Sequence, residues 1–524
     1  MNKNNSGQLL YTVRVSLIVA LGGFLMGFDA SVISGVVGFI EREFSLGKIQ
    51  LGWAVASLAL TASLAMLAAG PISDRIGRRP VLKIAALLFL VSALASAVAP
   101  NFATLVIARL IGGLGVGAAL IIAPMYIAEI APSRLRGRLV SLNQLNIVIG
   151  ISVAFFSNYL ILKLGEGQSF FTQVLNMDIW GWRWMLGIEA LPALLYFLFL
   201  YLVPESPRWL VMQNREAEAQ HTMGKLSSPE QASQDVLAIQ QSLLQKTEKG
   251  SFRQLLSPSM RLVLTIGVSV AILQQITGIN SVFFYAPMIF EQSGIGTNAS
   301  FMQAILVGLT NLVFTLVALA FIDKLGRKPL LGFGVLGISL CMFTLAYSFH
   351  SATYQLTESN AAELPQEIDR SLLVPLEGVL YTNDLQFKAA VSAQLGAELA
   401  LQYESALIQA AANMNSRLIL FAILGFVASF AVSLGPVMWV LFSEIFPNHI
   451  RGIAISFVGL INSGVSFGVQ LVFPWELATL GSAATFLIYG LFALAGLAVI
   501  LRVLPETKDK SLEELEAILI KPAA

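Results

Sequence analysis

Long apolar segments recur along the whole chain, and short polar turns separate them. Each is close to the length of about 20 residues that a helix needs to cross a bilayer. We expect one membrane-spanning helix in each of twelve segments: 14–37, 50–70, 80–99, 102–125, 139–162, 183–203, 261–290, 299–321, 329–349, 416–442, 451–473 and 482–504. The pattern therefore predicts an all-α polytopic membrane protein with twelve transmembrane helices.

Two longer polar segments interrupt this rhythm and suggest the domain boundaries. The predicted parts are an N-terminal six-helix bundle (1–203), a cytoplasmic linker with short helices (204–260), a C-terminal six-helix bundle (261–504) with an extracytoplasmic helical insertion (350–415), and a cytoplasmic tail (505–524). Apolar residues recur every four positions between Gln386 and Ala412, which predicts a helix in the second half of the insertion.

Composition and charge narrow the class of protein further. Hydrophobic residues make up 56% of the chain and charged residues 12%, which leaves too little charge for the surface of a soluble enzyme. The net charge of +1 does not indicate the excess of basic residues that is typical of a nucleic-acid-binding protein. A single cysteine excludes an intramolecular disulfide framework. With the N-terminus inside, the cytoplasmic segments hold 24 of the 32 basic residues, so we expect both termini in the cytoplasm.

An internal repeat relates the two bundles. DRIGRRP at 74–80 matches DKLGRKP at 323–329, and EIAPSRLRG at 129–137 matches EIFPNHIRG at 444–452. The positive-inside rule alone explains the arginines but not the acids that recur at fixed spacing. We therefore predict a cytoplasmic gate of ion pairs at helix ends. Its residues are Asp74, Arg75, Arg78, Glu129, Arg136, Asp323, Arg327, Glu444 and Arg451.

Several motifs along the chain are together specific for one family. They include GGFLMGFDASVISG at 22–35, PESPRWL at 204–210, QQITGIN at 274–280, GPVMWVLFSEIFPNHIRG at 435–452 and PETK at 505–508. With these motifs the chain resembles the sugar porters of the major facilitator superfamily, which include bacterial proton-coupled xylose and hexose symporters and facilitative glucose transporters. The resemblance implies the two-bundle major facilitator fold, alternating access, and a monosaccharide or polyol substrate.

Asp29 and Arg109 lie inside predicted spans, where a charged residue costs about 2.5–3.5 kcal/mol on insertion scales. Asp29 lies in the first span and Arg109 in the fourth, and we expect the two side chains to face each other. One interpretation is a structural ion pair that only holds two helices together. The other is a proton switch, because a carboxylate that loses its guanidinium partner is driven to take up a proton. The resemblance favours the switch, since matching positions in proton-coupled sugar porters have this role.

Neutral amides and one aromatic ring are the candidate sugar contacts. An amide both donates and accepts hydrogen bonds, as a sugar hydroxyl does. The resemblance assigns substrate binding to Gln144, Gln274, Gln275, Asn280, Asn311, Trp439 and Asn462. Gly278 is expected to permit local unwinding of the seventh span. Departures from the family pattern at Ile151, Phe284, Ser463 and Met26 leave the identity of the sugar open.

The expected function is therefore secondary active transport, a proton-coupled symport of a hexose or pentose by alternating access. A facilitative sugar or polyol uniporter and a non-transporting sugar sensor are the alternatives. We expect no enzymatic activity, no catalytic or metal-binding residues, and no cofactor besides the proton as coupling ion. The expected partners are a small sugar, protons and the lipid bilayer, with no nucleic acid. We further expect a monomer in a bacterial inner membrane.

Overall fold

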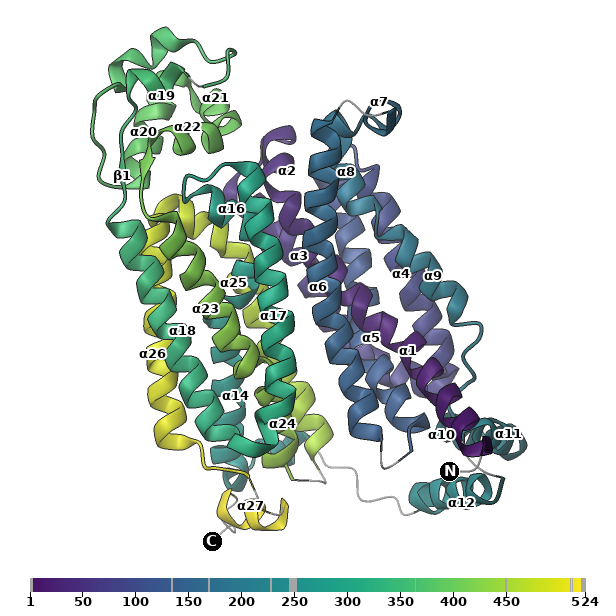
Figure 1. Cartoon of the computed structure of the whole chain (residues 1–524). Coiled ribbons are helices and arrows are strands. Elements are labelled where there is room, and N and C mark those ends of the chain that lie inside the picture. Colours follow the sequence, from purple (N-terminus) through teal and green to yellow (C-terminus); the bar gives the residue numbers. More distant parts are fainter. Residues whose placement is uncertain are drawn as a thin grey trace. The chain divides into compact units, whose positions relative to one another are not determined.

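The computed structural model describes residues 3–132, 135–167, 170–226, 229–244, 252–362, 364–447, 450–508, 510 and 512–519. Within these residues the chain is almost entirely helical (Figure 1). The long helices are α1 (Lys3–Val32), α3 (Lys48–Ile76), α4 (Arg78–Ala97), α5 (Phe102–Ile130), α6 (Arg136–Glu166), α14 (Arg261–Ile276), α17 (Thr297–Leu325), α18 (Arg327–His350), α23 (Ser416–Val432), α25 (Arg451–Thr479) and α26 (Gly481–Val503).

Shorter helices connect or extend the long ones. They are α2 (Val37–Glu43), α7 (Phe170–Leu175), α8 (Met177–Gly187), α9 (Ala190–Phe199), α10 (Pro207–Met212), α11 (Glu216–Leu226), α12 (Pro229–Leu244), α13 (Phe252–Leu255), α15 (Ile279–Phe284), α16 (Ala286–Glu291), α24 (Leu434–Ile445), α27 (Leu512–Leu519), and the 3₁₀ helices η1 (Ile33–Gly35) and η2 (Pro258–Met260).

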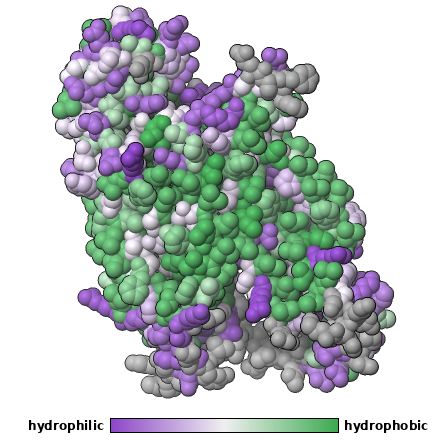
Figure 2. All heavy atoms as spheres, in the orientation of Figure 1, coloured by the Kyte–Doolittle hydropathy of each residue, from purple (hydrophilic) through white to green (hydrophobic). Residues whose placement is uncertain are grey.

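The chain forms two compact units. Unit 1 comprises Met1–Ala30, Ser57–Ala154 and Arg183–Ser251, and unit 2 comprises Ser31–Ala56, Phe155–Trp182 and Phe252–Ala524. In unit 1, the core is built from small and aliphatic side chains such as Ala85, Val116 and Ile122 together with the aromatic rings of Phe89 and Tyr126. Figure 2 shows that hydrophobic residues cover most of the helical surface on the face drawn, as expected of helices in contact with lipid.

Eleven segments of the described chain are long and apolar enough to cross a membrane. The predicted sixth span, 183–203, is not one continuous helix. It is divided between α8 and α9, and the break falls at Ile188 and Glu189. The predicted sixth span thus corresponds to two shorter helices, and its apolar composition carries no signal for the break beside the buried carboxylate of Glu189. The count of twelve spans and the cytoplasmic position of the termini stay predictions.

Two glycines turn the chain sharply before α4 and α18. Gly77 has a φ of 104° and Gly326 a φ of 90°, which is a region that residues with a β-carbon rarely adopt. A β-carbon at Gly77 would also collide with the carboxylate of Glu205, and one at Gly326 would lie 2.9 Å from the carboxylate of Glu506. The repeated motifs therefore need glycine for backbone conformation and for the close approach of an acid.

The insertion between α18 and α23 has its own hydrophobic core, which contains Tyr354, Leu356, Phe387, Val391 and Leu407. Its elements are β1 (Thr353–Tyr354), α19 (Glu358–Ala362), η3 (Arg370–Leu372), η4 (Val374–Leu376), α20 (Asp384–Leu395), α21 (Ala397–Gln402), α22 (Glu404–Ala411) and β2 (Ala412–Asn413). The two strands pair antiparallel where the chain enters and leaves the insertion. Hydrophilic residues gather over it in Figure 2.

The predicted single helix over 386–412 is instead three helices, α20, α21 and α22. Gly396, with a φ of 81°, ends α20, and Tyr403 has non-helical backbone angles between α21 and α22. Apolar residues of α20 and α22 pack against the core, whereas α21 has no buried residue and its Leu399 is 37% exposed. Periodicity alone therefore overestimated the length of the helix.

Polar contacts fix the insertion to the helices beneath it. Lys388 Nζ lies 2.8 Å from Glu404 Oε1, and it donates to Gln292 Oε1 at 2.6 Å, just after α16. Burial opposes ionisation of Glu404, but Lys388 and Lys48 lower the pKa of its carboxyl to about 2. At the other edge, Asp384 Oδ2 accepts from the backbone N–H and the hydroxyl of Ser482, both at 3.1 Å, at the start of α26.

Candidate functional site

A buried ion pair joins α1 and α5 in unit 1. Arg109 Nη1 donates to Asp29 Oδ1 at 2.5 Å and to the Asp29 carbonyl at 3.0 Å, and each residue is 1% exposed. The predicted pairing of these two side chains is therefore present. A β-carbon on Gly112 would lie 2.8 Å from Asp29 Oδ2, so this glycine leaves room for the carboxylate.

The pair is poorly satisfied for so buried a site. Among the described residues, Asp29 Oδ2 and Arg109 Nε and Nη2 have no hydrogen-bond partner. Glu189, at the break between α8 and α9, is 2% exposed, and its Oε1 also lacks a partner among those residues. Its carboxylate interacts electrostatically with both Asp29 and Arg109. A second buried acid is thus within electrostatic range of the pair, and a proton can replace the lost attraction when Asp29 and Arg109 separate.

Four of the predicted amides form one hydrogen-bonded cluster in unit 2. Gln275 Nε2 donates to Gln274 Oε1 at 3.2 Å and to Asn462 Oδ1 at 3.1 Å. Asn280 Nδ2 donates to Gln275 Oε1 at 2.7 Å, and Asn462 Nδ2 donates to Gln274 Oε1 at 2.8 Å. These amides satisfy one another, and sugar hydroxyls offer the same donors and acceptors in exchange.

A break in the seventh span brings this cluster together. The helix α14 ends at Ile276, Gly278 adopts the left-handed conformation with a φ of 87°, and α15 begins at Ile279. The local unwinding predicted at Gly278 is therefore present. It places Asn280 close to Gln275 although the two residues are five positions apart, a spacing that an unbroken helix would not bring onto one face.

The other three predicted sugar contacts come from helices that supply none of the four amides. Asn311 is buried on α17, and Trp439 is 40% exposed on α24. Gln144 is exposed on α6 in unit 1. The structure adds two residues that the sequence did not indicate. Ser466 Oγ accepts from Asn280 Nδ2 at 2.7 Å and from Gln470 Nε2 at 2.8 Å. The four-residue spacing of polar side chains at 462, 466 and 470 on α25 is the signal that could have found them.

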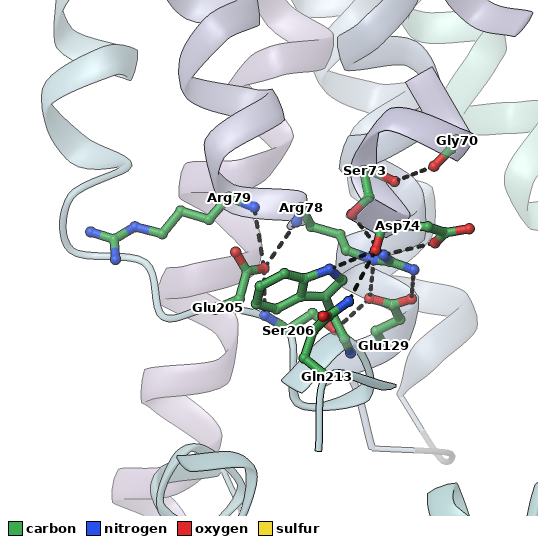
Figure 3. A network of polar contacts seen from close by, with 10 residues as sticks. Gly70, Ser73, Asp74, Arg78, Arg79, Glu129, Glu205, Ser206 and Gln213 are labelled. Carbon is green, nitrogen blue, oxygen red and sulfur yellow. Dashed lines mark hydrogen bonds and ion pairs between the residues drawn. The ribbon is translucent and has the colours of Figure 1, made fainter. Parts of the chain in front are cut away.

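A second polar cluster surrounds the first copy of the repeated motif (Figure 3). Arg78 donates to both oxygens of Glu129 at 3.1 Å, and its Nη1 lies 2.9 Å from Asp74 Oδ1. Glu205 accepts from the backbone N–H groups of Arg78 at 3.0 Å, Arg79 at 3.3 Å and Ser206 at 2.8 Å. Burial raises the pKa of Glu205.

The second copy repeats this cluster in unit 2. Arg327 donates to Glu444 Oε1 at 3.0 and 2.7 Å, and the Thr507 hydroxyl donates to Glu444 Oε2 at 2.6 Å. Glu506 accepts from the backbone N–H groups of Arg327 at 3.0 Å and Lys328 at 3.1 Å. Although burial acts against it, these and further backbone donors leave the pKa of Glu506 below its usual value.

The predicted gate residues thus divide into two groups. Asp74, Arg78 and Glu129 meet in one cluster, and Arg327 and Glu444 meet in the other. Three of the remaining four residues lie outside both ion-pair clusters: Arg75 and Arg136 are exposed, and Arg451 Nε donates to the Phe446 carbonyl. The side chain of the fourth, Asp323, lies outside the described residues.

The motifs PESPRWL and PETK supply the acids and hydroxyls that complete these clusters, although the predicted list of gate residues did not include them. They are Glu205, Ser206, Glu506 and Thr507. Ser206 Oγ donates to Glu129 Oε2 as Thr507 Oγ1 donates to Glu444 Oε2. The signal that could have found them is the repeat of Pro-Glu followed by a hydroxyl residue at 204–206 and 505–507.

Comparison with known proteins gives matches over nearly the whole chain. The family model described as "Sugar (and other) transporter" matches residues 15–363 and 389–519, so the unmatched internal part lies in the insertion. The arabinose-proton symporter of Bacillus subtilis is 33% identical over 98% of this chain and 97% of its own length. The D-xylose-proton symporter of Escherichia coli K12 is 34% identical over 97% of this chain and 96% of its own length.

Solved structures agree with these matches. The inward-open structure of the xylose transporter XylE from E. coli matches with a TM-score of 0.73 and 33% identity, over 96% of this chain and 99% of that one. The structure of the same proton:xylose symporter bound to 6-bromo-6-deoxy-D-glucose matches with a TM-score of 0.69 and 34% identity, over 98% of this chain and 100% of that one.

Proposed function

The chain belongs to the sugar transporter family and has the major facilitator fold, and we propose that it is a proton-coupled symporter of a pentose or hexose. It is a multi-pass membrane protein of the bacterial inner-membrane type. The observation that carries the proposal is the buried, incompletely satisfied pair of Asp29 and Arg109 beside Glu189. A neutral sugar has no other means of using the membrane potential, since only a charge gains energy from it.

In the proposed cycle, protonation of Asp29 releases Arg109 and lets α1 and α5 move relative to each other. Deprotonation restores the pair and the starting state. This assignment accounts for the cost of burying both charges, because a pair that only held two helices together gains little over apolar packing. A facilitator would need no titrating acid at this place, so the alternative of uniport leaves the unsatisfied carboxylate oxygen unexplained.

Sugar binding is proposed at the amide cluster of Gln274, Gln275, Asn280 and Asn462. Binding would exchange amide–amide hydrogen bonds for amide–hydroxyl bonds, so little hydrogen-bonding energy is lost when the site empties. Gln144, Asn311 and Trp439 are proposed as further contacts on the strength of the family pattern. The break at Gly278 supports movement of α15 during the cycle, as in other transporters with discontinuous helices.

The two motif clusters are proposed to act as cytoplasmic gates that hold helix ends in each half. The finer organisation also remains our proposal. It comprises twelve spans with both termini in the cytoplasm, bundles at 1–203 and 261–504, a monomeric state, and no catalytic chemistry or cofactor besides the proton.

Uptake by purified protein in proteoliposomes tests the proposed function. Radiolabelled pentoses and hexoses would be offered with and without an imposed pH gradient, acidic outside. Accumulation above the outside concentration that depends on the gradient is expected for at least one sugar. Equilibration to equal concentrations in both conditions would identify a facilitator, and no sugar-specific uptake in the panel would contradict sugar transport.

A further inference from the structure

A basic pocket lies in unit 1, beside the gate cluster of Arg78 and Glu129. Its volume is about 540 Å³, and residues from the end of α3, the start of α4, and helices α10 and α11 line it. Three basic residues line it, Arg79, Lys83 and Arg215, together with Glu205 and Glu218. The distribution of basic residues predicts that this end of the unit lies at the cytoplasmic surface.

The two acids of the pocket already have partners. The Glu205 carboxylate accepts from backbone N–H groups at the turn into α4, and Glu218 forms an ion pair with Arg215 at 2.6 Å. Within the described part of the chain, neither Arg79 nor Lys83 forms an ion pair with a carboxylate. Arg79 instead donates to the Leu200 carbonyl at 3.0 Å and the Tyr201 carbonyl at 2.8 Å.

Arg79 and Lys83 are therefore two cations without a counter-anion on one face of a helix. Lys83 Nζ lies 3.3 Å from the centre of the Tyr201 ring, and Arg79 extends away from the gate cluster in Figure 3. Like charges four positions apart on a helix repel each other and destabilise it. An anion bound between the two side chains would remove that repulsion.

The second half of the chain shows that the turn itself does not need a lysine at position 83. The repeat aligns Arg79 with Lys328, and Lys328 Nζ likewise donates to a carbonyl, that of Leu501, at 2.9 Å. It aligns Lys83 with Gly332, which carries no charge at all. The equivalent turn before α18 thus forms without a charged residue at this position, so the turn itself does not explain the charge of Lys83.

The surroundings of the pocket indicate where the anion comes from. Tyr201 is 55% exposed and Leu202 is 68% exposed, and both follow directly on the end of α9, where Leu198 and Phe199 are exposed as well. Lysine and arginine near helix ends extend toward the headgroups of the bilayer, and basic pockets between helices on the cytoplasmic side bind lipid phosphates. We propose that Lys83 and Arg79 bind the phosphodiester of an anionic phospholipid in the inner leaflet.

Binding at this place would also affect the gate. The backbone N–H of Arg79 donates to Glu205, which in turn holds the turn next to Arg78. A phosphate on the Arg79 side chain therefore fixes the same residue from the opposite side. We expect anionic lipid to stabilise the gate cluster of unit 1 and to have no comparable effect on the cluster of Arg327 and Glu444.

Lipid retention by the full-length protein tests this site independently of transport. Wild type, Lys83→Gln, Lys83→Arg and the control Lys225→Gln would be purified from vesicles of phosphatidylglycerol and phosphatidylcholine. Bound lipid would then be titrated by native mass spectrometry. Lys225 is an exposed lysine on α11 at the same end of the unit, so the control removes an equal charge outside the pocket.

Loss of one basic contact near a membrane surface corresponds to about 1 kcal/mol, or roughly fivefold in affinity for phosphatidylglycerol. We expect this loss for Lys83→Gln and wild-type affinity for Lys83→Arg and Lys225→Gln. Equal affinity of Lys83→Gln and wild type would overturn the site. Displacement of the lipid signal by millimolar inorganic phosphate would show that the pocket binds soluble anions, which contradicts the proposed lipid source. Thermal unfolding of each variant verifies that it is folded.

Discussion

Replacement of Asp29 by asparagine separates the coupling role of the acid from its structural role. Asparagine has the same size as aspartate and can still accept a hydrogen bond from Arg109 Nη1, but it cannot bind or release a proton. The larger Asp29→Glu does not fit as a control, because Gly112 already packs closely against the carboxylate. Asp29→Asn therefore removes the titration while it keeps most of the shape.

The expected effect follows from one titrating carboxylate in each cycle. One elementary charge crossing 100 mV gains about 2.3 kcal/mol, which supports an accumulation of about fiftyfold for a neutral sugar. Without a proton at position 29 the accumulation ratio should fall to about one. The variant also leaves the buried Arg109 charge without its direct partner, a loss that costs about 3–5 kcal/mol when nothing replaces it. The hydrogen bond that asparagine still accepts and the electrostatic attraction of Glu189 offset part of this cost.

Two assays on the same proteoliposomes give the comparison. Sugar counterflow requires only binding and exchange, so it should persist in Asp29→Asn and verify folding. Uphill uptake at an imposed potential should disappear. Glu189→Gln serves as the matched variant, since it neutralises the neighbouring acid and leaves the pair of Asp29 and Arg109 in place. Accumulation near fiftyfold in Asp29→Asn would refute the assignment, and its loss only in Glu189→Gln would move the proton site to Glu189.

Three further predictions concern the gate, the amide cluster and the insertion. In thermal unfolding, Glu129→Gln should lower the free energy of unfolding by about 2–3 kcal/mol and Glu444→Gln by about 1 kcal/mol. The ion pair of Glu129 with Arg78 is more buried than that of Glu444 with Arg327, so equal losses would contradict this ranking. Asn462→Leu should weaken sugar binding at least tenfold by calorimetry, since it removes bonds to Gln274 and Gln275, and unchanged affinity would exclude the cluster. Glu404→Gln should lower the thermal stability at pH 7, because the folded pKa of Glu404 is about 2 and lies below an unfolded value of about 4.3. The stability advantage of the wild type over this variant should therefore shrink as the pH falls from about 4 through 2, and a difference independent of pH would be inconsistent with the ion pair.

The sequence predicted the spans well where apolar length alone decides the structure. It also predicted that Asp29 and Arg109 would pair, because two charges in apolar helices have few alternatives to each other. The repeat predicted that Arg78 with Glu129 and Arg327 with Glu444 would occupy equivalent positions. In each of these cases one strong physical constraint, burial of charge or of apolar surface, acts at short range on a few residues.

Other features depend on where helices end in space, which a linear pattern does not specify. Glu205 and Glu506 belong to two of the family motifs, but the sequence does not show that their carboxylates accept hydrogen bonds from the backbone N–H groups at the start of α4 and α18. The break before Glu189 and the separation of α20 from α21 at Gly396 were missed because apolar periodicity continues across both. Ser466 was missed since a hydroxyl residue in a membrane helix commonly bonds to its own backbone.

The coupled movement of protons and sugar is the central claim, and one measurement addresses it directly. Proteoliposomes with no preset gradient would receive a sugar that the protein carries, while a pH electrode follows the lightly buffered medium. We predict alkalinisation of the medium with about one proton entering for each sugar molecule, and its loss in Asp29→Asn. Sugar entry at the wild-type rate with no change of external pH would contradict the account.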